Sequence, residues 1–106
     1  HSRVTGPIAE KIVSLFHADK AFISIDGIVL NKGITSFDAE RGQLVSRVIE
    51  NAKQTIVMTD SSKIGLTQLY LMAGWRDIDI VICDVSVPKG WRQTLDEMGV
   101  DWIWAQ

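Results

Sequence analysis

The segment from Thr59 to Gly65, TDSSKIG, places an acid, two hydroxyl groups and a lysine together directly after an apolar run. Asp60 and Lys63 are three residues apart, close enough to form an ion pair or to face one shared ligand. Ser61 and Ser62 add the hydroxyls, and backbone N–H groups in such a turn can point outward and bind an anion. Lys63 supplies a compact positive charge suited to a phosphate or a carboxylate. The alternative is a solvated turn in which a serine caps a helix.

Two further segments carry groups of the same kind. Asp26-Gly27 directly follows the apolar run 21–25, and Lys32-Gly33-Ile34-Thr35 is a glycine loop that can approach an oxyanion closely. Each segment can also be a simple turn, since Asp-Gly is a common turn dipeptide. Gathered at corresponding strand ends, the three segments predict a pocket for a polyol phosphate. Its aspartates would accept hydrogen bonds from hydroxyl groups, while lysine and backbone amides would hold the phosphate.

The elements that position these groups can be read from the spacing of apolar residues. Short apolar runs predict buried strands at residues 21–25, 55–60, 78–83 and 101–105. Amphipathic segments predict helices at residues 7–17, 38–52 and 88–98, the last stopped by Gly99. Residues 69–73 suit either a strand or a helix, and residues 27–37 are predicted to form a loop.

This alternation predicts an α/β fold with a parallel sheet that is covered by helices on both faces. In open parallel sheets, ligands bind beyond the carboxyl ends of the strands. Three of the predicted strands end in an acid, namely Asp26, Asp60 and Asp84. Their polar groups should therefore meet at one edge of the sheet, and this explains why TDSSKIG follows a buried strand.

Apolar side chains at helical or alternating spacing mark the faces expected to be buried. The first helix has Ile8, Ile12, Leu15 and Phe16, and the second has Leu44, Val45, Val48, Ile49 and Ala52. The last strand is expected to carry Trp102 and Trp104 on one face and Ile103 on the other. The four tryptophans fit core packing or a subunit contact better than ligand stacking. Trp102 and Trp104 would form an apolar patch if no helix covered their face.

Composition restricts the class of protein. The chain has 106 residues, of which 46% are hydrophobic and 23% charged, and its formal net charge is −2. It therefore lacks the basic surface that DNA binding requires, and contact with DNA would need another segment. A single cysteine, Cys83, excludes an intrachain disulfide and favours a reducing compartment, the cytoplasm. No apolar run approaches the ~20 residues of a membrane helix. His17 has no second ligand nearby, and neither a metal nor a cofactor is predicted.

The run DKAFISIDGIVLNKGITSFDAE followed by TDSSKIG closely resembles the sensor domain of DeoR-type transcriptional repressors. The resemblance covers nearly the whole chain. It implies a Rossmann-like, mainly parallel sheet flanked by helices, related to ribose-5-phosphate isomerase, glucosamine-6-phosphate deaminase and the CoA transferases. It also implies a ligand-sensing domain of a bacterial regulator of carbohydrate metabolism, in which a phosphorylated sugar or related metabolite controls DNA binding by a separate winged helix-turn-helix.

The resemblance also implies which residues meet the effector. Asp60 and Lys63 match the Asp-x-x-Lys motif of the family's effector site, with Ser61 and Ser62 between them. Asp26-Gly27 and the loop Lys32-Gly33 to Thr35 match segments that border the sugar in the isomerase relatives.

The sequence departs from the family in its extent. The helix-turn-helix and the first half of the sensor domain, with its phosphate loop, are absent. Residues 1–106 are therefore expected to be a single, truncated domain that forms the C-terminal part of a larger one. A sheet edge or apolar face left open would favour a homo-oligomer. DNA would be bound only through the absent N-terminal domain, and no membrane contact is expected.

Two other functions remain open at this stage. A sugar-phosphate isomerase or deaminase would need a carboxylate base, and Glu40 is the nearest glutamate to the glycine loop. Glu40 lies about one helical turn too far upstream of the Asp-x-x-Lys motif and suits a helix N-terminus better. The sequence therefore predicts a binding domain and no catalytic residues. The remaining possibility is an assembly module that uses the tryptophans and an exposed sheet edge.

Overall fold

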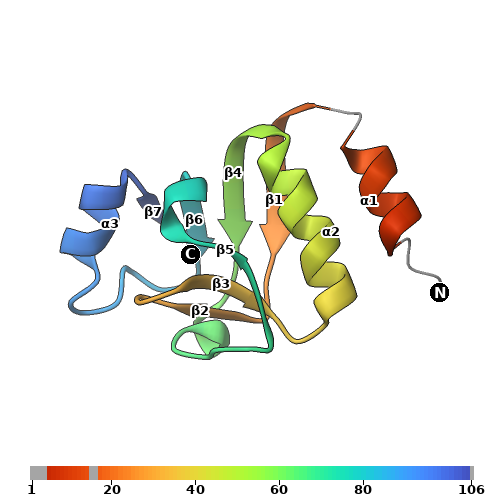
Figure 1. Cartoon of the computed structure of the whole chain (residues 1–106). Helices are drawn as coiled ribbons and strands as arrows, with labels where there is room; N and C mark the ends of the chain where they lie inside the picture. Colours follow the sequence, from red (N-terminus) through yellow and green to blue (C-terminus); the bar gives the residue numbers. More distant parts are fainter. Residues whose placement is uncertain (1–4, 15–16, 106) are drawn as a thin grey trace.

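The computed structural model describes residues 5–14 and 17–105, which form two sheets and their flanking helices (Figure 1). The helices are α1 Pro7–Val13, α2 Ala39–Glu50 and α3 Arg92–Met98, with 3-10 turns η1 Ser61–Lys63 and η2 Trp75–Asp77. The strands are β1 Ala18–Ser24, β2 Gly27–Val29, β3 Gly33–Ser36, β4 Ala52–Met58, β5 Tyr70–Ala73, β6 Ile80–Cys83 and β7 Asp101–Trp104.

The larger sheet is parallel throughout, and the predicted α/β class is confirmed. Its strand order is β1-β4-β6-β7. Val57 in the centre pairs with Ile23 on one side and Val81 on the other, so β-branched residues line up across the sheet. Because all four strands run the same way, the segments that follow β1, β4 and β6 leave the sheet at one edge.

The prediction of a loop over residues 27–37 is wrong, because most of this segment is an antiparallel β-hairpin. Gly27 pairs with Thr35 and Val29 pairs with Gly33. The glycines favoured a loop in the sequence, but Ile28 and Ile34 in the two strands of the hairpin are fully buried. Burying an isoleucine is worth roughly 1.5–3 kcal/mol, enough to hold the hairpin against the sheet.

The ambiguous run 69–73 forms β5, which is antiparallel to β3 and completes the smaller sheet β2-β3-β5. Figure 1 shows β2 and β3 lying across the carboxyl ends of β1 and β4. Tyr70 of β5 packs on Gly42 of α2, where an added Cβ would collide with the tyrosine ring. Gly42 therefore allows a close approach, and its N–H still donates to Asp38 O at 2.8 Å, so the helix is regular there.

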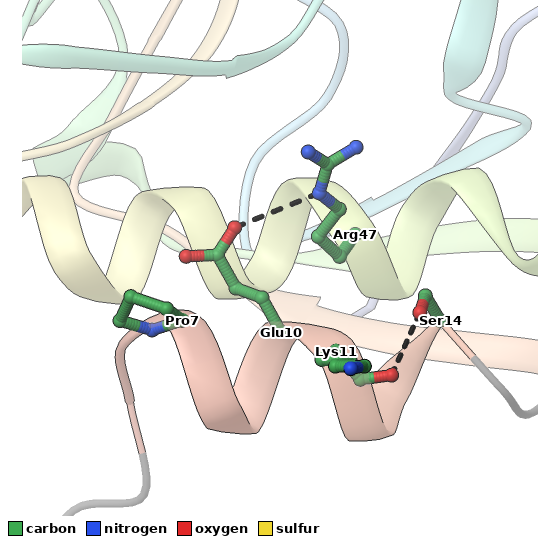
Figure 2. Close-up of a pocket in the computed structure, with 5 residues that line it drawn as sticks. All are labelled: Pro7, Glu10, Lys11, Ser14 and Arg47. Atoms are coloured by element: carbon green, nitrogen blue, oxygen red, sulfur yellow. Dashed lines mark hydrogen bonds and ion pairs between the residues drawn. The ribbon is translucent and has the colours of Figure 1, made fainter.

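Helix α1 packs against α2 with Ala9 buried, but Ile8 and Ile12 are largely exposed. The apolar face predicted for this helix is therefore not buried against the described part of the chain. Leu15 and Phe16, predicted to belong to it, lie outside the described residues. Figure 2 shows the groove between the two helices, where Glu10 Oε1 and Arg47 Nε are 3.6 Å apart.

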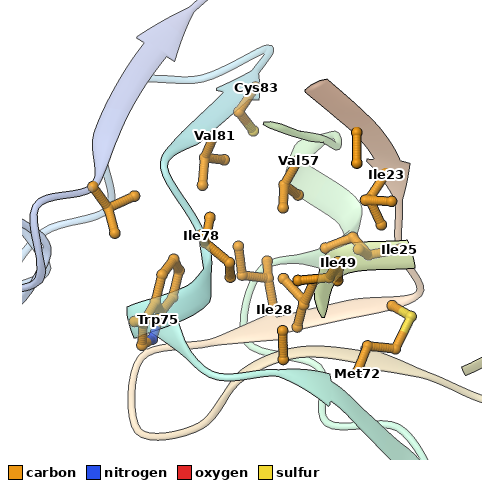
Figure 3. Close-up of a cluster of buried hydrophobic side chains, with 14 of the residues drawn as sticks. Ile23, Ile25, Ile28, Ile49, Val57, Met72, Trp75, Ile78, Val81 and Cys83 are labelled. Carbon is orange, nitrogen blue, oxygen red and sulfur yellow. The ribbon is translucent and has the colours of Figure 1, made fainter. Parts of the chain in front are cut away.

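The core lies between the inner face of the parallel sheet and the smaller sheet, and side chains from both meet there (Figure 3). The parallel sheet contributes Ile23, Val57 and Val81, and α2 contributes Ile49. Cys83 is buried in the same cluster, and this burial raises the pKa of its thiol. It is thus a packed core residue, as an apolar strand predicts.

The outer face of the parallel sheet is open, so the prediction of cover on both faces is wrong for the described residues. Phe22 is 59% exposed, Met58 45% and Ile103 46%. The strand register aligns Met58 with Ile82 and Ile82 with Ile103, which makes a continuous apolar row across three strands. We call the surface formed by these four side chains the open face.

The last strand has the predicted alternation, with Trp102 and Trp104 on the inner side and Ile103 on the open face. Trp102 stacks edge-on against Trp91, with ring centroids 6.1 Å apart. The expected helix from Pro88 begins only at Arg92, and Gly99 ends it in a left-handed conformation as predicted.

Candidate functional site

The turn after β4 is a single 3-10 turn capped by Asp60. Asp60 Oδ1 accepts a hydrogen bond from Ser62 N at 2.8 Å and another from the Ser62 hydroxyl. These bonds, and to a lesser degree the charge of Lys63, lower the pKa of the Asp60 carboxyl. Asp60 is therefore ionised near neutral pH, and one of its oxygens already holds the turn.

The backbone amides of this turn are used within the protein. Ser61 N donates to Asp84 Oδ1 at 2.8 Å, and Lys63 N donates to Asp60 O at 3.1 Å. With the Ser62 amide on the Asp60 carboxylate, none of these three N–H groups is left to point outward. The prediction that these amides point outward to bind an anion is therefore wrong, because they already donate hydrogen bonds to neighbouring carboxylates and carbonyls.

The Lys63 ammonium of this turn differs from the backbone amides in its contacts. Lys63 is half-buried, and its ammonium makes no ion pair with any residue in ranges 5–14 and 17–105. A lysine ammonium offers three donors and binds a phosphate as a point charge. Lys63 is therefore the group of this turn that is best able to bind an anion.

The end of the β2–β3 hairpin where Gly27 pairs with Thr35 packs directly on the chain that follows Lys63. Gly65 N donates to Ile28 O at 2.8 Å, and Gln68 N donates to Thr35 Oγ1 at 3.0 Å. A Cβ at Gly27 would collide with the carbonyl oxygen of Leu66, so only glycine permits this approach. The structure thus brings Asp26, Gly27 and Thr35 to the same edge as Lys63.

The side chains of Asp26 and Thr35 make hydrogen bonds within this packed region. Thr35 is buried, and its hydroxyl donates to Gly27 O at 3.2 Å while accepting from Gln68. Asp26 Oδ2 accepts from Ser36 Oγ at 3.1 Å and from Phe37 N at 3.2 Å. Thr35 therefore faces the protein, whereas the half-buried Asp26 keeps its second carboxylate oxygen without a hydrogen-bond partner in the described chain.

Lys32 and Gly33 lie at the other end of the hairpin. Gly33 has φ 130° and packs so closely on β5 that a Cβ would collide with Ala73 O. Lys32 lines a cavity of about 340 Å³ together with Trp75 of η2 and Met98 of α3. The structure therefore does not bring this pair of residues to Lys63, because hairpin pairing, which the loop prediction lacked, directs them away.

Two polar residues at this edge were not singled out as site residues. Asp84 follows β6 and accepts from Ser61, as described above. Arg41 of α2 donates from Nη2 to Ser24 O at 2.8 Å and to Ser24 Oγ at 3.2 Å, at the end of β1. Its Nη1 is buried without a hydrogen-bond partner among the described atoms. Only the strand-end position of Asp84 could have suggested a role from sequence.

Five cavities among the described residues lie away from the turn. The largest of the five, about 470 Å³, is the groove between α1 and α2 in Figure 2, and none of them is lined by Asp60 or Lys63. Asp60, Ser61 and Ser62 are exposed and Lys63 is half-buried, so the edge that carries Lys63 is a surface site. Glu40 lies in the first turn of α2, where its Oε2 accepts from Thr5 Oγ1 at 2.9 Å.

Metal ligands do not cluster in the portions 5–14 and 17–105, where no group of three or more His, Cys, Asp or Glu residues could hold an ion. Those same portions contain no helix with the length and apolar character to cross a membrane.

The family model described as the DeoR C terminal sensor domain matches residues 1–85. The chain belongs to this family. The match includes the hairpin, the β4 strand and the whole TDSSKIG turn, and it ends one residue after Asp84. The prediction from sequence motifs is therefore confirmed at the level of the family.

Transcriptional regulators are similar to this sensor domain over most of its length. The HTH-type transcriptional repressor GlcR of Bacillus subtilis (strain 168) is 37% identical over 94 residues, which are 89% of this chain and 36% of GlcR. The regulator YulB of the same organism is 30% identical over 95 residues, or 90% of this chain and 37% of YulB. The HTH-type regulator GlpR of Haloferax volcanii is 23% identical over 97 residues, 92% of this chain and 38% of GlpR. The chain thus spans little more than one third of the curated relatives that it matches.

Proposed function

We propose that this sensor domain binds a phosphorylated sugar or a related metabolite at the carboxyl edge of the parallel sheet. Lys63 binds the anionic group, the Ser61 and Ser62 hydroxyls lie beside it, and Asp26 and Asp60 accept hydrogen bonds from the alcohol groups. The observation that carries the proposal is a lysine without an ion-pair partner in the described chain, on a turn held by the Asp60 carboxylate. A charge-assisted bond to such a lysine is worth about 1.5–3 kcal/mol.

In the intact protein, binding at this edge controls a separate winged helix-turn-helix that contacts DNA, in the cytoplasm and within a homo-oligomer. The HTH-type relatives, nearly three times as long as the matched segment, support this arrangement. The effector can shift DNA binding only if it binds two arrangements of the protein with different affinities.

We propose further that residues 1–106 are the C-terminal part of a larger sensor domain, and that another part of the same protein covers the open face. The support is chemical. Met58, Ile82 and Ile103 form an apolar row on this face, and Phe22 is exposed on the same face. Exposed apolar surfaces of this kind in soluble proteins are usually interaction sites. The extra length of the relatives supplies a source for that cover.

The domain has no enzymatic activity in this proposal. Glu40, the candidate base, is exposed in the first turn of α2 and engaged with Thr5. A general base must reach the proton that it abstracts, and the Glu40 carboxylate is directed toward the segment before α1. Turnover of ribose 5-phosphate or glucosamine 6-phosphate by the intact protein would contradict this part of the proposal.

The test of the binding site is Lys63→Ala in the intact protein, with induction by a phosphorylated sugar as the readout. We expect induction to weaken about tenfold or more, since a charge-assisted bond is lost. The matched control is Lys53→Ala in β4, the strand before the turn, where the Lys53 ammonium is 3.6 Å from Asp19 at the opposite end of the sheet. If Lys63→Ala responds like the control, Lys63 is not in the site.

A further inference from the structure

The segment that leaves β6 is fixed by two tryptophans of β7. Trp104 Nε1 donates to Asp84 O at 3.1 Å, and Trp102 Nε1 donates to Val85 O at 2.9 Å. The two acceptor residues, Asp84 and Val85, are the last two residues matched by the family model, while β7 lies beyond the matched segment. An element outside the family-matched part thus sets the conformation of the chain at the end of that part.

Asp84 connects this segment to the turn after β4 by a hydrogen bond. Its Oδ1 accepts from Ser61 N at 2.8 Å, and just before it Ile82 O accepts from Thr59 N at 3.0 Å. Lys63 follows Ser61 within the same 3-10 turn, whose Ile64 N donates to Ser61 O at 3.2 Å. Fixing Ser61 therefore fixes the backbone from which the Lys63 side chain extends.

We propose that Asp84 is a positioning residue for Lys63, and that Trp104 in turn positions Asp84. The C-terminal strand thereby tunes the affinity of the edge for an anionic ligand without touching the ligand. This inference rests on the proposed function, since it concerns the same edge of the sheet.

The chemistry of Asp84 separates positioning from direct binding. A carboxylate repels an anion, so its charge works against a phosphate held by Lys63. Its useful property is an acceptor oxygen for Ser61 N, which an asparagine also offers. Asp84→Asn should therefore keep the turn and bind the anion at least as well as wild type, whereas Asp84→Ala should lose the turn.

The first measurement needs no ligand and follows hydrogen exchange of the Ser61 amide by NMR. We expect exchange to be about fivefold or more faster in Asp84→Ala, because the only acceptor of that N–H is gone, and close to wild type in Asp84→Asn. Asp101→Asn is the matched control, since it removes an exposed carboxylate from the other end of β7. Unchanged Ser61 exchange in a folded Asp84→Ala protein overturns the inference.

The second measurement is binding of ribose 5-phosphate and glucosamine 6-phosphate to the intact protein by calorimetry. For whichever ester binds, we expect Asp84→Ala to weaken binding about fivefold, Trp104→Phe about twofold, and Asp84→Asn not at all. Equal affinity of wild type and Asp84→Ala overturns the inference. Failure of wild type to bind either ester counts against the proposed function instead, and the exchange of Ser61 still decides whether Asp84 holds the turn.

Discussion

Two turns of this molecule each combine a lysine with a glycine and a hydroxyl residue, but they lie at different positions in the fold. Lys63 lies in the turn after β4, and Lys32 in the turn between β2 and β3. The first turn is joined to the segments after β1 and β6 through Ile28 and Asp84. The second lines a cavity together with residues of η2 and α3, away from those segments.

The difference shows that a site at the end of a parallel sheet is defined by strand direction. The carboxyl ends of β1, β4 and β6 converge because the strands are parallel. A turn inside an antiparallel hairpin has no such constraint, and pairing with Gly27 to Val29 carries Lys32 and Gly33 to the far end. Residue types alone did not distinguish the two turns.

The largest expected effect is on the contact between the hairpin and the chain that follows Lys63. In Gly27→Ala, the new Cβ meets Leu66 O and the Thr35 hydroxyl, so we expect the free energy of unfolding to fall by about 2–3 kcal/mol. Gly65→Ala is the control: it has φ 85° but open space around it, and should cost about 1 kcal/mol. Urea denaturation of both variants checks the order, and equal losses would mean that the close contact at Gly27 does not hold the two segments together.

A smaller effect distinguishes the two lysines directly. Lys63→Ala should weaken binding of a phosphorylated sugar about tenfold or more, and Lys32→Ala less than about twofold, because only Lys63 lies at the shared edge. Calorimetric titration of the intact protein measures both. The comparison fails if Lys32→Ala is the more damaging substitution.

The open face offers a test with little effect on stability. For residues 1–106 expressed alone, we expect self-association that the pair Phe22→Thr and Ile103→Thr abolishes, while unfolding changes by no more than about 0.5 kcal/mol. Leu69→Thr is the control, since Leu69 is 79% exposed and lies outside the open face. Sedimentation velocity gives the masses, and an unchanged distribution in the double variant would exclude this face as the contact.

The smallest effect is the pH dependence of the Lys63 turn. Folding lowers the Asp60 pKa below its ordinary value of 3.8, so its stabilising contribution is complete above that pH and is lost as the pH falls through the lower folded value. Asp60→Asn keeps an acceptor for Ser62 N but loses the negative charge, so exchange of the Ser62 amide should be slightly faster than in wild type above about pH 4 and equal to it in stronger acid. A difference that persists unchanged in strong acid would rule out ionised Asp60 as the cap.

Much of the fold was predictable because its signals are local. The apolar runs gave β1, β4, β6 and β7, and Asp38 and Gly99 mark helix ends through their own backbone preferences. The hairpin was missed because its glycines serve close packing against Leu66 O and Ala73 O, contacts that are distant in sequence. The open face was missed because Phe22 and Ile23 are apolar on opposite sides of β1, and a continuous apolar run does not show whether each side is covered.

The site was predictable at the level of strand ends and not of hydrogen bonds. Asp60 and Lys63 could be placed together from their spacing. The bond from the Ser62 amide to Asp60 is local to the turn, but the bond from the Ser61 amide to Asp84 depends on the register of β4 and β6, which sequence does not give.

The most direct test of the central claim is to map where a ligand binds. The ¹⁵N-labelled intact protein is titrated with a phosphorylated sugar, and amide chemical shifts are followed. We expect the largest changes at residues 59–65 and at Asp26, with Lys32 and Gly33 unchanged. Changes centred on Lys32 and Gly33, with residues 59–65 unmoved, would contradict a ligand site at the carboxyl edge of the parallel sheet.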